Sequence, residues 1–524
     1  FRRVLFRSEK LTTIEGLKNL NTSQLTDMRY MFNSCKSLKS IDLSQFNTSN
    51  VTGMREMFED CASLESIDVS GFDTSKVNSM NNMFAGCKKL RSLDLRSFDF
   101  TTVNEKEYYT LERLVANSGI YALFLPKNAM SGYDFTSYAN NCQSSGDDGT
   151  PLLRIYYAGS EDEWTALNNK VGYSSYSWAT ISVVYDYTGD GNMWVTADNW
   201  YEDYNYELVG GAVLLLHSSK GTIASEFIEI PATTTIDGVV YQVKVDFVPA
   251  EESYYDGMWK QDKAKLLGIR FADGVQTTEN CKYLFYDLEN LQVLDIRGLD
   301  TSAATTMEGM FYYCSRLREF LPGEKFDTSN VTNMSGMFIH CHRLKTIDVS
   351  GFNTSKVTDM SSMFGFCNVV KELDLSGFDT AKVTDMDGMF SACHALTSLD
   401  VSGFNTAKVT NMGSMFSGCE KLTSLALTGF DTAKVSNMQL MFTDTNALEI
   451  LDLRSFDFGK VRATEYDQRG DYVKTIIYNA GVKELYLPVD AMNYFDFTDE
   501  ERKAPNLEKI YYVGTEAQWA ALQN

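Results

Sequence analysis

Hydrophobic and polar positions recur along this chain with a period of 26 residues. Phe352, Phe378, Phe404 and Phe430 keep this spacing, and the motif Met-x-x-Met-Phe occurs nine times. The motifs begin at Met28, Met54, Met80, Met307, Met334, Met360, Met386, Met412 and Met438. Self-similarity at a fixed period is typical of solenoids, in which each unit buries its apolar face against the next unit.

Each unit divides into two halves with different hydrophobic periods. In the copy that begins at Met360, the apolar residues follow the i, i+3, i+4, i+7 pattern that predicts one face of a short helix. Residues 373–376, Leu-Asp-Leu-Ser, alternate apolar and polar positions as a strand does. Neither element is stable alone, so we expect stacked copies with parallel strands on one side and short helices on the other. The predicted fold class is an α/β solenoid.

The repeats form two tandem arrays that end in similar segments. Arg96-Ser-Phe-Asp-Phe matches Arg454-Ser-Phe-Asp-Phe, and a segment with one tryptophan, Trp164 or Trp519, comes after each. We interpret these segments as caps that close the open end of a solenoid, and expect both tryptophans on short terminal helices. A segment rich in Tyr, Val and Thr precedes the second array and predicts a β-rich cap between the arrays.

The sequence therefore predicts a division into several parts. The first eight residues resemble the translation of a sequencing adapter and are left out of the fold prediction. The remaining parts are a first array at 9–98 that lacks its N-terminal cap, its C-terminal cap at 99–178, a β-rich N-terminal cap at 179–270, a second array at 271–456 and its C-terminal cap at 457–524.

Composition narrows the classes of partner. The 524 residues carry a net charge of −23, and the sequence pI is about 4.7. Phosphate backbones and anionic lipid repel such a chain, so we expect no nucleic-acid partner. No stretch reaches the roughly 18–20 continuous apolar residues of a membrane span, so we expect no membrane insertion.

The cysteines and histidines raise the questions of disulfide pairing and metal binding. Eight of the ten cysteines occur once per repeat, and the last repeat has Thr445 in that position, which favours packing over disulfide pairing. Cys142 has no partner in this interpretation. His340-Cys341-His342 has the residue types of a metal site, but we expect solvated loop histidines and no metal. No motif of a nucleophile, phosphate loop or zinc protease appears, so we expect neither enzyme nor cofactor.

The most informative polar feature is a row of aspartates that alternate with core positions. We expect them, with a parallel row of serines, to form a candidate binding face on the sheet side: Asp42, Asp68, Asp94, Asp348, Asp374, Asp400, Ser350, Ser376 and Ser402. Local hydrogen bonds, a cationic partner or Ca²⁺ each explain the row. A second row, Thr48, Thr74, Thr328, Thr354, Thr380, Thr406 and Thr432, predicts hydroxyls that satisfy backbone amides in turns.

Two motifs near the middle of the chain have structural explanations. Residues 186–192, Asp-Tyr-Thr-Gly-Asp-Gly-Asn, match part of a calcium loop, but the twelfth position is Ala197 where such loops need glutamate, so we predict a turn. Trp194, Trp200 and Tyr201 could stack on sugars, but packing within the cap is the favoured interpretation.

The repeat resembles known families. Leu64-x-x-Ile67-x-Val69 fits the leucine-rich repeat core, and FDTSxVTxMxxMFxxCxxLxxLDLSGF looks like the repeat of BspA-like bacterial surface proteins and mycoplasma surface lipoproteins. The resemblance implies a non-enzymatic, extracellular or cell-surface protein that mediates adhesion by binding a host or matrix protein or a glycan. We also expect a monomer. Alternatives are a structural stalk and a carbohydrate-binding accessory protein.

Overall fold

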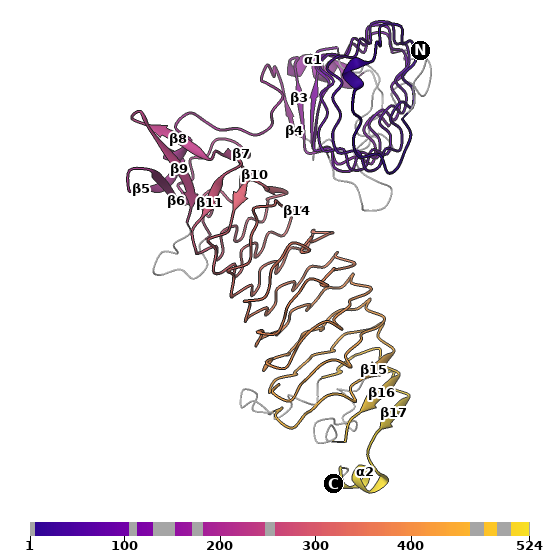
Figure 1. Ribbon diagram of the computed structural model, residues 1–524, viewed down its shortest axis with the longest axis vertical. Coiled ribbons are helices and arrows are strands. Elements are labelled where there is room, and N and C mark those ends of the chain that lie inside the picture. The colour runs from indigo at the N-terminus through magenta and orange to yellow at the C-terminus, as the bar shows by residue number, and fades with distance from the viewer. Residues whose placement is uncertain are drawn as a thin grey trace. The chain divides into compact units, whose positions relative to one another are not determined.

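The protein forms two compact units, Phe1–Met193 and Trp194–Asn524, in a computed structural model. Each unit is described by itself, and Figure 1 shows both along the chain. The structure describes residues 6–103, 113–128, 152–169, 182–246, 257–461, 476–489 and 505–522.

The first unit holds one short parallel sheet at its C-terminal end. Its strands pair in the order β1-β2-β3-β4. The elements are the 3₁₀ turn η1 (Leu17–Asn19), β1 (Ser92–Asp94), β2 (Ala122–Leu125), β3 (Arg154–Tyr157), α1 (Glu161–Asn169) and β4 (Ser182–Val184).

The second unit begins with a β-rich region. Two sheets lie there, in the orders β14-β12-β10-β7 and β13-β11-β9-β6-β5, with β8 antiparallel to β9. The C-terminal sheet is parallel, β15-β16-β17. The elements are η3 (Trp200–Asp203), β5 (Tyr204–Val209), β6 (Val213–Ser219), β7 (Phe227–Ile230), β8 (Thr233–Ile236), β9 (Val239–Val245), β10 (Gly268–Phe271), β11 (Val275–Thr277), β12 (Val293–Ile296), β13 (Leu299–Asp300), β14 (Glu319–Pro322), β15 (Ile450–Asp452), β16 (Glu484–Leu487), β17 (Lys509–Tyr512) and α2 (Glu516–Leu522).

Between the caps, the chain forms a parallel β-solenoid with very little helix. Successive turns lie one over another within each unit (Figure 1). Isolated parallel bridges join them at steps of 26 or 27 residues: Asp27–Gly53–Ser79 in the first unit, and Asn280–Thr306–Asn333–Asp359–Asp385–Asn411–Asn437 in the second.

The expected short helices do not form over the Met-x-x-Met-Phe motifs. An α-helix needs each N–H to donate four residues back. Here the N–H groups of alternate residues donate to the next turn instead: Ser362 to Asp387, Phe364 to Met389 and Phe366 to Ser391, with N···O distances of 2.6–2.9 Å. Ser362 and Phe366 have positive φ values of 54° and 59°, which lie outside the right-handed helical region. The prediction was wrong because tight stacked turns bury the same i, i+3, i+4, i+7 positions.

The expected strands form only in part. Residues 373–376 lie outside any strand, and the Leu-Asp-Leu segment is a strand only where it adjoins a cap, as in β1, β12 and β15. Alternation is nevertheless kept, with Leu373 and Leu375 buried and Asp374 exposed. The regular hydrogen bonds between turns lie mainly on the Met-Phe side. The Leu-Asp-Leu side has few such bonds, so it is extended without being assigned as a strand.

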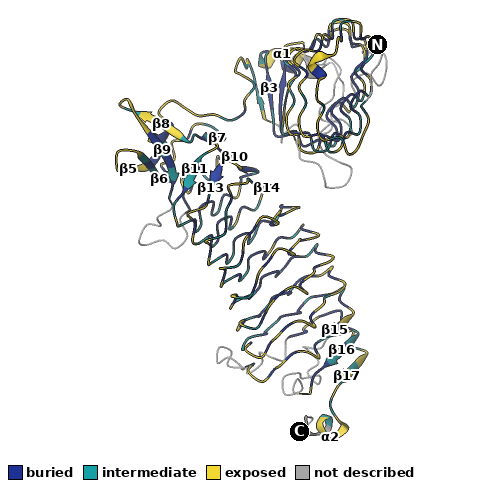
Figure 2. Cartoon of the chain, viewed as in Figure 1, coloured by how far each residue is buried: buried dark blue, intermediate teal, exposed yellow. Residues whose placement is uncertain are grey.

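Ladders of identical side chains fill the interior, and Figure 2 marks the buried positions along the chain. Phenylalanine rings from Phe285 to Phe442 stack at centroid distances of 5.2–5.9 Å with interplanar angles of 14° or less. Phe6 continues the ladder of the first unit, 5.3 Å from Phe32. The methionines of each motif are buried beside the rings. Each turn thus contributes the same apolar set to one continuous core.

The cysteine row packs and does not pair, as expected. Nine described cysteines are free and buried. Cys367 donates from Sγ to the carbonyl of Phe338 at 3.3 Å, and Thr445 serves the final position by donating to the carbonyl of Phe442 at 2.8 Å. Burial raises the pKa of the Cys61 thiol to about 12, so the reactive thiolate is disfavoured. Cys142 lies outside the described residues.

The threonine row satisfies backbone groups between turns, as predicted. The hydroxyl of Thr380 accepts from the Asn405 N–H at 2.7 Å and donates to the Asn405 carbonyl at 3.1 Å. The same pair of hydrogen bonds links Thr354 to Asp379 and Thr406 to Asp431. These threonines are about 1% exposed, so no water replaces their hydroxyls.

The caps differ from the prediction at one boundary. Trp164 and Trp519 lie on α1 and α2, as expected, 5.0 and 5.3 Å from the rings of Tyr157 and Tyr512. Residues 182–193, assigned by sequence to the second cap, instead belong to the first unit, because β4 pairs with β3. Trp194 opens the second unit and packs edge-on against Phe227 at 5.9 Å.

We predict that Thr380→Val destabilises the second unit by about 1–3 kcal/mol, because it removes the buried hydroxyl that accepts from the Asn405 N–H and donates to the Asn405 carbonyl. Urea unfolding followed by circular dichroism measures the change. Thr380→Ser keeps the hydroxyl and serves as the control. Equal stability of the Val and Ser variants would contradict the structural role of the hydroxyl.

Candidate functional site

The aspartate row runs along the exposed side of the solenoid. Each carboxylate accepts from the backbone N–H two residues later, which starts the turn that leads to the next buried phenylalanine. The donors to Asp42, Asp68, Asp348, Asp374 and Asp400 are the serines at positions 44, 70, 350, 376 and 402, at N···O distances of 2.9–3.1 Å. The expected local hydrogen bonds are therefore present.

These hydrogen bonds favour the charged form of the carboxylates. The Ser402 hydroxyl donates to Asp400 at 2.6 Å, and together with the Ser402 N–H it lowers the pKa of Asp400. Ser376 lowers the pKa of Asp374 in the same way. Both side chains are exposed and ionised at neutral pH, so the row carries negative charge at regular intervals.

A shallow groove of about 750 Å³ lies along this row in the second unit. Leu373, Leu399 and Leu425 are among its lining residues, together with two members of the aspartate row. The remaining lining residues are Thr346, Glu372, Asp374, Ser398, Asp400, Ser424 and Ala426. Ala426 stands 26 residues after Asp400, in the aspartate position, so the acidic row ends there.

The groove lies where neighbouring turns share few hydrogen bonds. In this described part of the chain, no backbone hydrogen bond links segments 346–350, 372–376, 398–402 and 424–428 to one another. Backbone bonds resume just outside it, as from the Thr397 N–H to the Lys371 carbonyl at 3.1 Å. Apolar side chains and backbone polar groups therefore meet at this surface, next to the carboxylates.

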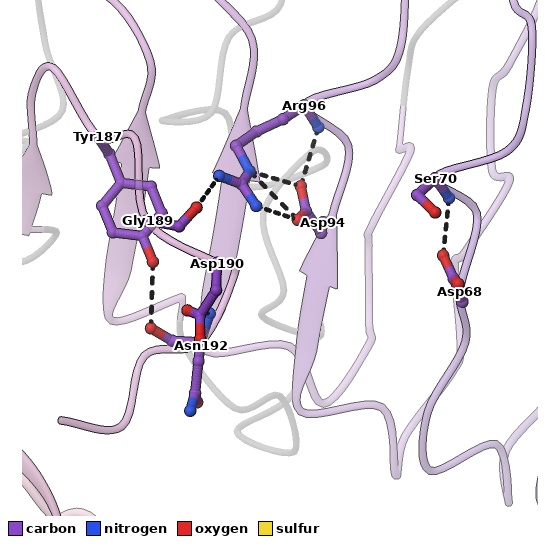
Figure 3. A network of polar contacts seen from close by, with 8 residues as sticks. All are labelled: Asp68, Ser70, Asp94, Arg96, Tyr187, Gly189, Asp190 and Asn192. Atoms are coloured by element: carbon purple, nitrogen blue, oxygen red, sulfur yellow. Dashed lines mark hydrogen bonds and ion pairs between the residues drawn. The ribbon is translucent and has the colours of Figure 1, made fainter. Parts of the chain in front are cut away.

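Asp94 differs from the rest of the row because an arginine neutralises it. Arg96 donates from Nη2 to Asp94 at 2.7 Å and from Nη1 to the carbonyl of Gly189 (Figure 3). Residues 186–192 lie over this pair, and Asp190 accepts from the Asn192 N–H at 2.9 Å, a local turn as expected. Among the described residues, no group of three or more His, Cys, Asp or Glu side chains is arranged to hold a metal ion.

A row of outward aromatic rings on the Met-Phe side is a feature that sequence reasoning missed. His340 stacks between Tyr313 and Phe366 at 4.2 and 4.3 Å. Tyr313 and Phe366 are 37% and 38% exposed. All three precede the repeat cysteine and have positive φ, so reading that one position along the repeats would have found them. Burial lowers the pKa of His340, and its ring serves packing.

The tryptophans near the second cap pack inward. Trp200 and Tyr201 are buried, and Trp200 lies 5.9 Å from Tyr204 in an edge-on contact. This geometry fits the expected packing role.

Stacked turns with side-chain ladders define a repeat protein of the solenoid class. The sequence matches the family model described as "Mycoplasma protein of unknown function, DUF285" over residues 3–118, 279–395 and 365–470. These matches span more than half of the chain, and the protein belongs to this family.

Other comparisons find distant likenesses only. A leucine-rich repeat protein from Bacteroides ovatus ATCC 8483 is 14% identical, with 60% of this chain and 98% of that chain covered and a TM-score of 0.23. The TLR13–ssRNA13 complex is 11% identical, with 93% and 83% covered and a TM-score of 0.16. No curated protein matches the chain. In the part of the chain that the structure describes, no helix has the length and apolar character to cross a membrane.

We predict a specific acid dependence for the aspartate row. A lowered native pKa stabilises the fold above the ordinary aspartate pKa of about 3.9, and this stabilisation is lost as pH falls through the native pKa. The wild type should therefore be more stable than the Asp374→Asn, Asp400→Asn variant at about pH 6, and the difference should close as pH falls through the lowered native pKa values of the two carboxyls. Urea unfolding across this range measures it. A constant difference would contradict the assignment.

Proposed function

We propose that this protein is a non-enzymatic recognition protein, extracellular or at the cell surface, that binds a basic partner through the acidic groove. The observation that carries the proposal is that Glu372, Asp374 and Asp400 line the same groove as Leu373, Leu399 and Leu425. Such a surface suits an extended protein segment with lysine or arginine side chains and apolar neighbours. A host or matrix protein of this character is the expected class of partner.

The electrostatics of the chain supports this proposal. Regular carboxylates with lowered pKa values present fixed charge, and the overall charge of −23 adds long-range attraction for cations. The resemblance of the repeat motif to that of BspA-like surface proteins adds the expectation of an adhesive role. A structural stalk would require no particular surface chemistry, so the groove favours recognition over a stalk.

Binding of a labelled peptide of alternating lysine and serine to the full chain tests the proposal. Asp374→Asn with Asp400→Asn keeps the acceptor for each serine and removes the charge. Since an exposed ion pair contributes about 0.5–1 kcal/mol, we expect affinity to fall by about 5- to 30-fold. Fluorescence anisotropy at low and high salt measures the loss and its screening.

Two matched variants decide whether the groove is responsible. Asp42→Asn removes one charge in the first unit and should leave affinity unchanged. Ala426→Asp extends the row by one carboxylate and should strengthen binding by about two- to fivefold. If all variants bind like the wild type, the peptide is held by net charge alone and the proposal fails.

A second candidate function, glycan binding, is favoured by the aromatic row. Exposed rings at Tyr313 and Phe366 flank His340 and offer stacking faces. Under this candidate, Tyr313→Ala with Phe366→Ala abolishes retention on a panel of soluble glycans and leaves lysine-peptide binding intact. Unchanged retention would remove the candidate.

A further inference from the structure

Three arginines of the second unit lie together without a carboxylate partner. The other described arginines of this unit each pair with an acid, at N···O distances of 2.6–3.4 Å: Arg270 with Glu229, Arg297 with Asp295 and Arg454 with Asp452. Arg316, Arg318 and Arg343 form no ion pair among the residues that the structure describes. Because the chain has a net charge of −23, carboxylates are in excess, and three unpaired arginines in one place require an explanation.

The register of the solenoid gathers these side chains at one corner. Arg316 and Arg343 each stand two residues after the repeat cysteine, in consecutive turns whose stacked phenylalanine rings are 5.2 Å apart. Arg316 and Arg318 flank the buried Leu317, so both side chains leave the core on the same side. Arg316 and Arg343 are exposed and Arg318 is half-buried. The three guanidinium groups therefore share one small area of surface.

The positive charges of this cluster act on one another. Burial, and then the charges of Arg343 and Arg316, lower the pKa of Arg318 to about 10, and the adjacent Glu319 opposes them less strongly. The buried Nε atom of Arg318 has no hydrogen-bond acceptor among the described residues, so the protein itself does not satisfy this guanidinium. Like charges without a counter-charge disfavour the charged form of each group. An anion bound at this corner relieves the repulsion.

The row of outward aromatic rings adjoins the arginines. Tyr313 and His340 precede Arg316 and Arg343 by three residues, with the buried repeat cysteine between them. The two turns are tight, because in each the N–H of the next leucine donates to the cysteine carbonyl, at 3.0 and 3.3 Å. Aromatic faces on which sugar rings stack therefore lie beside guanidinium groups, which bind sulfate and carboxylate in bidentate geometry.

We propose that Arg316, Arg318 and Arg343 bind the sulfate or carboxylate group of an acidic glycan. This inference names the ligand class of the glycan candidate and rests on it, and it uses no residue of the acidic groove. A glycan carries its anionic groups on only some of its sugars, which fits a cluster of cations limited to two turns. Nucleic acid places a phosphate at every nucleotide, and the charge of −23 repels such a polymer.

Fluorescence anisotropy on the full chain tests the site with two labelled probes, a sulfated heparin-derived hexasaccharide and a hexamer of galacturonic acid. We expect saturable binding of at least one probe, and weaker binding of the neutral maltohexaose. Arg316→Gln with Arg343→Gln removes two charges and keeps polar side chains, so affinity for the acidic probe should fall at least about tenfold. Arg270→Gln with Arg297→Gln removes the same charge from paired arginines and should change affinity less than about twofold.

Failure of this inference and failure of the glycan candidate give different results. Equal binding by the wild type and the Arg316→Gln, Arg343→Gln variant overturns the anion site, whatever the effect of Tyr313→Ala with Phe366→Ala. Dependence on the arginines without dependence on the two rings removes stacking and supports the anion site. No binding of either acidic probe, an equal loss in the paired-arginine control, or tighter binding of a single-stranded DNA of the same charge overturns the inference.

Discussion

Hydrogen bonds from one turn to the next, in fixed register, are the constraint on which this structure depends. Phe364 donates its N–H to Met389 of the next turn at 2.9 Å, while Met363 donates within its own turn to Met360 at 3.2 Å. Alternate backbone N–H groups therefore donate to the neighbouring turn and to their own turn. This division works only if neighbouring turns have the same shape, so the same residue types recur and form phenylalanine, cysteine and threonine ladders. The repeat in the sequence is a consequence of the register.

A stack that satisfies its backbone through neighbours leaves groups unsatisfied at its ends. In the caps, strands form sheets that pair these backbone groups: β1 to β4 in one unit and β15 to β17 in the other. Strand edges are prone to pair with other chains unless they are covered. The segment from Ser182 to Asn192 covers one such edge, which explains why it belongs to the first unit although its composition resembles that of the β-rich cap of the second unit.

Sequence predicted the stacking and the core because these depend on which side chains are apolar and how often they recur. It failed on the helices because Met360, Met363, Phe364 and Cys367 lie on one face of a helix and equally inside a tight turn. The deciding feature is the positive φ of Ser362 and Phe366, which residue type alone does not reveal. The aspartate row was predictable from alternation, but the groove depends on how neighbouring turns are bonded, and the boundary at 193 depends on a long-range strand pair.

The same register separates what must be constant from what can vary. Interior positions keep the same residue type because each side chain packs against its counterpart in the next turn. The position of Asp400 is occupied by Ala426 one turn later, because the Asp400 carboxylate accepts a hydrogen bond only from its own turn. The position before each cysteine changes from Tyr313 through His340 and Phe366 to Ala392, all with positive φ. A constant backbone thus displays different side chains at regular intervals. Exposed side chains along a row can therefore differ from turn to turn with little cost to the stack that supports them.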